Sequence, residues 1–151
     1  MGEISEMGTG INEKTVGVVL ANELGYERIA MACSACFAQL MGFPPARIED
    51  LKTVVSEAAI NAMQHGNRGR PDAKVTVFMN FSDGAINVSV TDEGDGLENF
   101  PPTPNIARII DNLDPPVGFG LLLIKQLADR VEFNKMTGGG HEIKMTIAMK
   151  T

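Results

Sequence analysis

The feature that most constrains the fold is a pair of alternating segments around one tight turn. Val75, Val77 and Met79 alternate with more polar residues, and Ser82-Asp83-Gly84 then predicts the turn of a hairpin. The return strand places Ile86, Val88, Val90 and Asp92 on one face, because side chains along a strand have a period of two. Asp92 is therefore expected to point where the hydrophobic residues point.

Length, composition and charge limit the class of protein. The 151 residues are 44% hydrophobic, which suits one compact domain spanning residues 1–151. A net charge of −6 disfavours non-specific binding to nucleic acid or to an anionic membrane. No apolar run reaches membrane-spanning length, and the first residues lack the pattern of a signal peptide. We expect a cytoplasmic protein.

The first half of the chain predicts one strand and two helices. Val16–Leu20 reads as a strand after a flexible start at residues 1–14, and Tyr26 to about Met41 reads as a helix. The expected core stripe of that helix is Ile29, Cys33, Cys36, Phe37 and Leu40. We interpret the two cysteines as buried structural thiols, although a C-x-x-C pair can also be redox-active or form half of a zinc site. The two histidines form no metal-ligand pattern.

The second helix is expected to begin near Pro45 and to run to about His65. Its apolar stripe consists of Leu51, Val54, Val55, Ala58 and Ala62. A polar stripe, Glu57, Asn61, Gln64 and His65, recurs at helical spacing on an adjacent face. A polar stripe beside a core stripe favours a helix that borders a cleft.

The second half contains a segment without regular pattern, a helix and a hairpin. Residues 97–117 contain five prolines, and so long a segment indicates a functional loop or lid. Residues 118–129 predict a helix rich in core residues. The strands Val131–Met136 and Glu142–Met149 are joined at three glycines, with Ile143, Met145, Ile147 and Met149 inward.

Two glycine-containing segments suit a nucleotide. Asp92 in an apolar setting needs a hydrogen-bond donor, which the exocyclic amino group of adenine supplies, and Gly94 and Gly96 allow the backbone to approach a flat base. Gly118-Phe119-Gly120-Leu121 opens a helix, where free N–H groups favour phosphate. Taken singly, the first segment also fits an ordinary acidic turn, and the second fits a helix start without a ligand.

The polar helix face offers a third group of candidates. The amide oxygen of Asn61 can ligate Mg²⁺, and Glu57 can accept a proton as a general base. A solvated helix face is the alternative for this pair. His65 and Asn67, at the helix exit, can shape the metal or phosphate side of a pocket or simply belong to a surface turn.

The order of these motifs resembles a known family. Glu57-x-x-x-Asn61 with His65-Gly66, Asp92-x-Gly94-x-Gly96, a variable lid, Gly118-Phe119-Gly120-Leu121 and a closing hairpin resemble the GHKL (Bergerat-type) ATPases, and most closely the anti-sigma factor serine kinases of bacteria. The resemblance covers about Val16 to Met149. It implies an α+β two-layer sandwich, in which helices cover one face of a mixed, mostly antiparallel sheet.

The resemblance also implies roles for individual residues. Glu57 looks like the catalytic base, Asn61 like the Mg²⁺ ligand and Asp92 like the adenine contact. Gly94, Gly96, Gly118 and Gly120 look like backbone positions that line ATP. Similar proteins bind a sigma factor, phosphorylate a serine or threonine of a STAS-type anti-anti-sigma partner, and are typically homodimers.

One departure from the family pattern keeps alternatives open. Many of these kinases have a basic residue just before the second glycine box, where this chain has Pro115-Pro116-Val117. Arg108 in the lid is a candidate substitute, or else a solvated charge. A missing cation would lower the rate of phosphoryl transfer more than it would weaken ATP binding. The alternatives are a non-catalytic ATP- or ADP-sensing module, a detached histidine kinase ATPase domain, and an α/β domain that binds no nucleotide.

Overall fold

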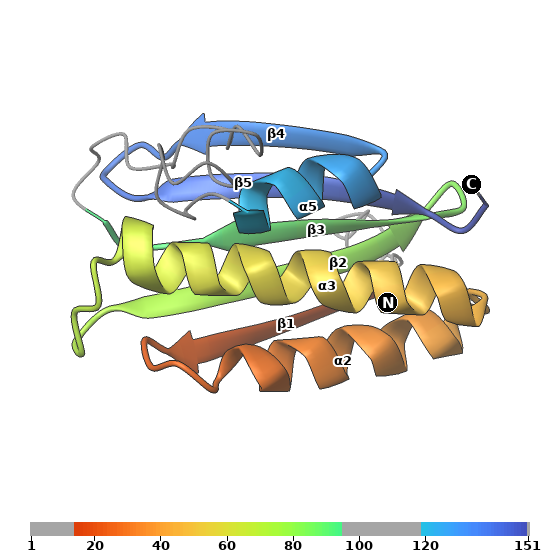
Figure 1. Cartoon of the computed structure of the whole chain (residues 1–151), viewed down its shortest axis with the longest axis horizontal. Helices are drawn as coiled ribbons and strands as arrows, with labels where there is room; N and C mark the ends of the chain where they lie inside the picture. The colour runs from red at the N-terminus through yellow and green to blue at the C-terminus, as the bar shows by residue number, and fades with distance from the viewer. Residues whose placement is uncertain (1–13, 95–118, 151) are drawn as a thin grey trace, which may run out of the picture.

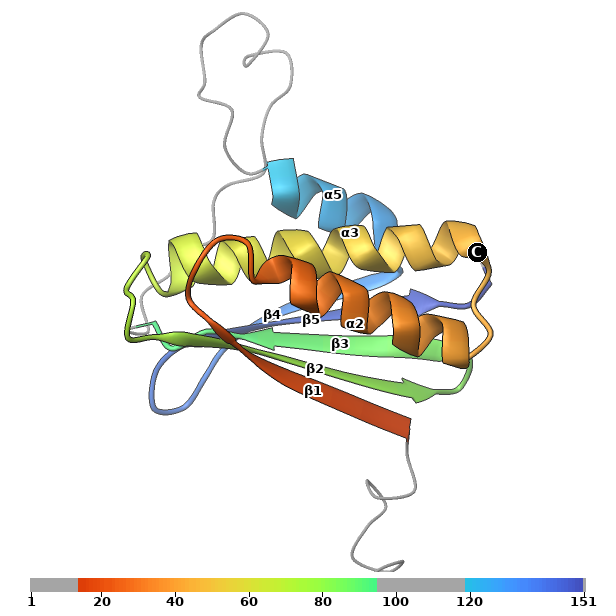
Figure 2. The same cartoon turned by 90° about the horizontal axis from the view of Figure 1, so that it is seen from below.

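The protein has one layer of β-sheet covered on one face by helices (Figures 1 and 2). The computed structural model describes residues 14–94 and 119–150. The expected flexible start therefore lies outside the described residues except for Lys14, which already belongs to the first strand. The expected lid, residues 97–117, also lies outside them. In the described part, no helix combines the length and apolar character needed to cross a membrane.

The sheet contains five strands in the order β1-β2-β3-β5-β4. Their bounds are Lys14–Ala21 for β1, Lys74–Ser82 for β2, Ala85–Thr91 for β3, Arg130–Lys135 for β4 and His141–Ala148 for β5. Every neighbouring pair is antiparallel, so the expected mixed sheet is fully antiparallel in the described residues. Register pairs such as Val77 with Val90 stack inward-facing residues across the sheet.

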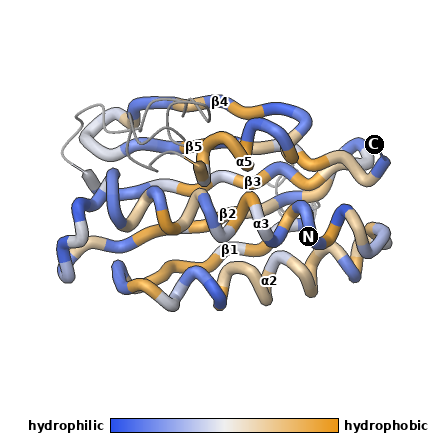
Figure 3. Tube along the Cα trace, viewed as in Figure 1, coloured by the Kyte–Doolittle hydropathy of each residue, from blue (hydrophilic) through white to orange (hydrophobic). Residues whose placement is uncertain are grey.

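The helices lie side by side on one face of the sheet (Figure 2). Helix α2 spans Glu27–Leu40, α3 spans Pro45–Asn61 and α5 spans Phe119–Leu127. A π-helical turn, η1, continues α3 over Ala62–Gly66. Helix α3 packs between α2 and α5, and its predicted apolar stripe is buried in the core. Figure 3 shows that the turn between η1 and β2 is hydrophilic, in contrast to α5.

The buried face of helix α2 differs from the predicted one. Ile29 and Leu40, expected in the core, are 51% and 74% exposed. The buried residues are Ala30, Ser34, Phe37 and Ala38, so the helix is rotated about its axis from the expected orientation. Small side chains on this face allow α2 to pack closely against α3, and a hydrophobicity pattern gives such residues little weight.

The two cysteines also differ from the prediction. Cys36 is exposed and Cys33 is half-buried, so the interpretation of both as buried thiols is wrong. Burial raises the pKa of the Cys33 thiol, and the neighbouring Cys36 raises that pKa further.

Arg47 joins the far ends of three elements. This side chain, at the start of α3, is only 5% exposed. Its Nε donates to the carbonyl of Ala148 at 2.8 Å, and its Nη2 lies 2.6 Å from Asp129 Oδ2, beyond the end of α5. No pattern in the sequence predicts this contact. It fixes α3 relative to α5 and β5.

Candidate functional site

The site lies where the polar face of α3 meets the end of β3 and the start of α5. Glu57 and Asn61 occupy successive turns of α3, and both are half-buried. Gly120 of α5 packs directly against Glu57, since a Cβ at Gly120 would lie 2.9 Å from Glu57 Oε2. The structure thus brings together two segments that are far apart in the sequence and that were both predicted to belong to the site.

The carboxyl group of Glu57 has an altered proton affinity. Its partial burial under α5 raises its pKa, because burial disfavours the charged form. A raised pKa makes the carboxylate a stronger proton acceptor. This direction suits a general base better than a purely solvated surface glutamate.

Asn61 carries an unsatisfied polar atom. Its Nδ2 is buried and has no hydrogen-bond partner in the described part of the chain. Such a group costs about 1–3 kcal/mol when nothing compensates it. The side chain also lines a small cavity together with Asp92 and His141. The orphaned amide suits a polar ligand that reaches Asn61.

Asp92 is buried, as the phase of the strand predicted, with 8% of its surface exposed. Its Oδ1 accepts hydrogen bonds from the backbone N–H of Gly94 at 2.9 Å and of His141 at 3.0 Å. Its Oδ2 accepts no hydrogen bond from the described residues. One oxygen therefore fixes the side chain, and the other remains available to a donor.

Three glycines surround this carboxylate. A Cβ at Gly66 would overlap Asp92 Oδ2, one at Gly94 would overlap the carbonyl oxygen of Gly66, and one at Gly140 would overlap the carbonyl oxygen of Asp92. Gly140 also has a positive φ of +88°. Sequence reasoning assigned no site role to Gly140 or His141, although the glycine run before His141 was a usable signal.

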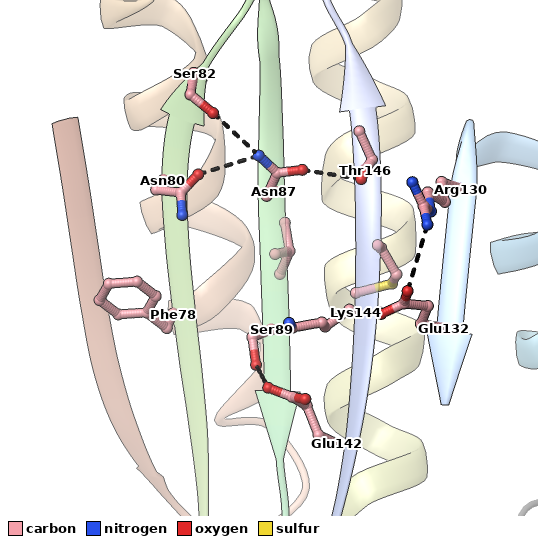
Figure 4. A pocket seen from close by; sticks show the side chains of 12 residues that line it. Phe78, Asn80, Ser82, Asn87, Ser89, Arg130, Glu132, Glu142, Lys144 and Thr146 are labelled. Carbon is pink, nitrogen blue, oxygen red and sulfur yellow. Dashed lines mark hydrogen bonds and ion pairs between the residues drawn. The ribbon is translucent and has the colours of Figure 1, made fainter. Parts of the chain in front are cut away.

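The cavity beneath Asp92 measures about 10 Å³, which is room for about one water. Its other walls are Ala58, Ala62, Val90 and Ile143. A much larger cleft, of about 590 Å³, lies on the face of the sheet away from the helices (Figure 4). Polar residues such as Asn87 and Glu142 line that cleft, and none of the predicted site residues contributes to it.

The remaining predicted residues divide into three groups. Asn67 is fully buried, and its side-chain amide forms hydrogen bonds to Asn22, to the carbonyl oxygen of Lys74 and to the N–H of Glu93. His65 is half-buried in η1, Phe119 is 38% exposed at the start of α5, and Leu121 belongs to the core. Gly96, Arg108 and Gly118 lie outside the described residues. No cluster of three or more His, Cys, Asp or Glu in residues 14–94 and 119–150 is placed to hold a metal.

The fold is that of a histidine kinase-like ATPase domain. Residues 20–147 match the family described as "Histidine kinase-like ATPase domain", and the chain belongs to this family. This match confirms the predicted family and fold.

Curated relatives of the chain include a serine-protein kinase and an anti-sigma factor. It is 33% identical to the serine-protein kinase RsbW of Bacillus subtilis over 74% of this chain and 69% of the relative. It is 32% identical to the anti-sigma F factor of Clostridium botulinum (strain Eklund 17B / Type B), over 50% of this chain and 52% of the relative. The chain thus spans only about half the length of that relative.

Two solved structures have the same fold. The structure of the RsbU and RsbW domains of Rv1364c from Mycobacterium tuberculosis matches 89% of this chain and 32% of that chain, with a TM-score of 0.62 and 17% identity. The SiaB–SiaC complex from Pseudomonas aeruginosa matches 97% of both chains, with a TM-score of 0.67 and 14% identity.

The close packing at Gly66 leads to a first prediction. Gly66→Ala should lower the free energy of unfolding by about 1–3 kcal/mol, because the added methyl group displaces the Asp92 carboxylate. Urea denaturation measures the change. Gly17→Ala is the matched control, since a Cβ there meets mainly the exposed ring of Phe78, at 3.3 Å. Equal stability of the two variants would contradict the packing described at Asp92.

Proposed function

We propose that this protein is a Mg-ATP-dependent serine/threonine protein kinase of the anti-sigma type. The observation that carries the proposal is the pairing, one turn apart on α3, of a desolvated carboxyl group and an orphaned buried amide opposite Asp92. The names of the relatives, serine-protein kinase and anti-sigma factor, support the same class.

Asp92 recognises the adenine base. Its Oδ2, which no described N–H group satisfies, accepts a hydrogen bond from the exocyclic amino group of ATP. Guanine has a carbonyl group at the corresponding position, so it would place two acceptors against each other. The small cavity below Asp92 is the floor of this adenine site, and Gly94 allows the backbone to approach the base, a role proposed also for Gly96.

Asn61 and the start of α5 hold the phosphate side. Asn61 offers an amide oxygen to Mg²⁺ and an N–H donor to a phosphate oxygen. Asn61 alone would suffice as the protein ligand, because Mg²⁺ generally needs few protein ligands beside a nucleotide. When bound there, Mg²⁺ would supply positive charge beside the phosphates of ATP. Gly120 allows α5 to approach Glu57 closely, and Gly118 and Arg108 are proposed to complete this side.

Glu57 acts as the general base. It accepts the proton of a serine or threonine hydroxyl group of the partner, while the hydroxyl oxygen forms the new bond to the γ-phosphorus and the bond to the ADP oxygen breaks. Its raised pKa suits this step, because the carboxylate binds the proton more strongly than an ordinary glutamate does.

The partners are a sigma factor and a STAS-type anti-anti-sigma protein, and phosphorylation of the latter decides which of them is bound. The name anti-sigma F factor supports the first partner, and the family resemblance supports the second. We further propose a cytoplasmic homodimer. The acidic net charge of −6 supports a protein that binds no nucleic acid or membrane directly.

A second candidate function is a non-catalytic module that senses ATP or ADP and releases a protein partner. The absence of a basic residue at Pro115-Pro116-Val117 favours it. Nucleotide-dependent complex formation without phosphate transfer would decide for this candidate. The kinase is favoured because Gly120 of α5 packs against the Glu57 carboxylate one turn from Asn61, and a binding module has no need of a carboxylate at that position.

The adenine site gives a second prediction. Mg-ATP at 100 times its Kd should stabilise the protein by about 2.7 kcal/mol, as measured by thermal unfolding. Asp92→Asn should weaken ATP binding about tenfold to a hundredfold, because an amide N–H group then faces the adenine amino group. Asp83→Asn, at the exposed turn of the same hairpin, should leave ATP binding unchanged. The absence of a thermal shift at millimolar Mg-ATP would contradict the proposed function.

The base gives a third prediction. Glu57→Gln should reduce transfer to the STAS-type partner by about 10²–10⁴-fold while ATP binding persists. The wild-type rate should fall as pH decreases through the pKa of Glu57, and this fall should lie above the range of an ordinary glutamate, about 4.3, because burial raises the pKa. Phosphoserine and phosphothreonine are quantified by mass spectrometry.

The matched control is Glu49→Gln in the exposed first part of the same helix. This variant should keep both the rate and its pH dependence. Unchanged transfer in Glu57→Gln would show that Glu57 is not the base.

A further inference from the structure

Asn67 is a buried amide whose hydrogen bonds reach three separate segments. Its Nδ2 donates to Asn22 Oδ1 at 3.1 Å and to the carbonyl oxygen of Lys74 at 3.0 Å. Its Oδ1 accepts the backbone N–H of Glu93 at 2.6 Å. The side chain is 0% exposed. One amide therefore connects the loop after β1, the start of β2 and the residue that follows Asp92.

The π-helical turn η1 precedes Asn67 and sets the position of this residue. The N–H of Asn67 donates to the carbonyl of Ala62 at 2.8 Å, five residues earlier, which is the π-helical spacing. This π turn ends the helix that carries Glu57 and Asn61. It also places Gly66 against the Asp92 carboxylate. The position of Asn67 thus links the helix of the proposed phosphate side to the strand end of the adenine side.

Glu93 is held from this side at its N–H, its carbonyl oxygen and its Oε1. Besides the bond to Asn67, its carbonyl accepts from Arg70 Nη2 at 2.5 Å, and its Oε1 accepts the N–H of Lys74 at 2.9 Å. The contacts from Arg70 and Lys74 are exposed, where water competes for the same groups. The bond from the fully buried Asn67 is partly buried, so water competes with it less.

The consequence concerns Asp92. On its N-terminal side the chain is fixed by β3 and by the bond from the Asp92 N–H to the carbonyl of His141, at 3.0 Å. On its C-terminal side it is fixed at Glu93. A displacement of Glu93 would move Asp92 Oδ2, the oxygen that no described N–H satisfies.

We propose that Asn67 is the positioning residue of adenine recognition: by holding the Glu93 backbone, it sets the place of Asp92 Oδ2 and thereby the preference for adenine over guanine nucleotides. This inference rests on the proposed function, since it requires a nucleotide at Asp92. It assigns Asn67 no contact with the nucleotide itself.

The chain offers a closely matched control in Asn87. Its Nδ2 donates to Asn80 Oδ1 at 3.1 Å and to Ser82 Oγ at 3.5 Å, and its Oδ1 accepts from Thr146 Oγ1 at 2.9 Å. Figure 4 shows these bonds in the cleft on the face of the sheet away from the helices. Asn87→Ala thus removes a similar set of hydrogen bonds at a distance from Asp92.

The experiment measures the Kd of Mg-ATP and of Mg-GTP for wild type, Asn67→Ala and Asn87→Ala, each at a temperature where circular dichroism shows the variant folded. In Asn67→Ala the Kd of ATP should rise about tenfold, equivalent to about 1.4 kcal/mol, with a much smaller change for GTP. In Asn87→Ala the ratio of the two constants should stay within about twofold of wild type. An unchanged ratio in Asn67→Ala would overturn the positioning role.

A measurement on the wild-type protein covers the case in which Asn67→Ala does not fold. Saturation with ADP should slow the hydrogen exchange of the Asn67 side-chain amide, followed by NMR, and should leave that of Asn87 unchanged. ADP binding without any effect on Asn67 would overturn the positioning role alone. A wild-type protein that binds neither ADP nor ATP would overturn the proposed function and this inference together.

Discussion

The structure of the site depends on one buried carboxylate, that of Asp92. A charged group in an apolar setting is costly unless hydrogen bonds satisfy it. Here the backbone N–H groups of Gly94 and His141 satisfy one oxygen, and the second lies against Gly66, where a side chain would not fit. The end of β3, the start of β5 and the end of the α3 helix must therefore meet in one arrangement. That arrangement leaves a single acceptor for a ligand.

Helix α3 connects this acceptor to the proposed chemistry. One stripe of the helix, including Leu51, Val54 and Val55, is buried in the core and fixes its orientation on the sheet. The adjacent stripe carries Glu57 and Asn61, which consequently cannot rotate away from α5 and Asp92. The apolar contacts make the helix rigid. Their stabilisation offsets the free-energy costs of a desolvated carboxyl group and an orphaned amide. Such local costs are expected where a protein binds a ligand.

Much of this arrangement follows from the sequence, because it depends on local periodicity. The alternation in β2 and β3 predicts the hairpin and the inward side chain of Asp92, and the helical spacing of Leu51 to Ala62 predicts the buried face of α3. The orientation of α2 could not be predicted in this way, because it depends on close packing of Ala30, Ser34 and Ala38 rather than on hydrophobicity. The π turn before Asn67 and the glycines around Asp92 depend on contacts between distant segments, which a single sequence does not reveal.

The proposed function requires Asp92 and Asn61 to hold the two ends of one adenine nucleotide. A crystal structure with Mg²⁺ and a non-hydrolysable ATP analogue tests it most directly. The exocyclic nitrogen of adenine should then lie about 3 Å from Asp92 Oδ2, and the Mg²⁺ ion about 2.1 Å from the side-chain oxygen of Asn61. A nucleotide bound in the cleft around Asn87 on the opposite face, or with its base away from Asp92, would contradict it.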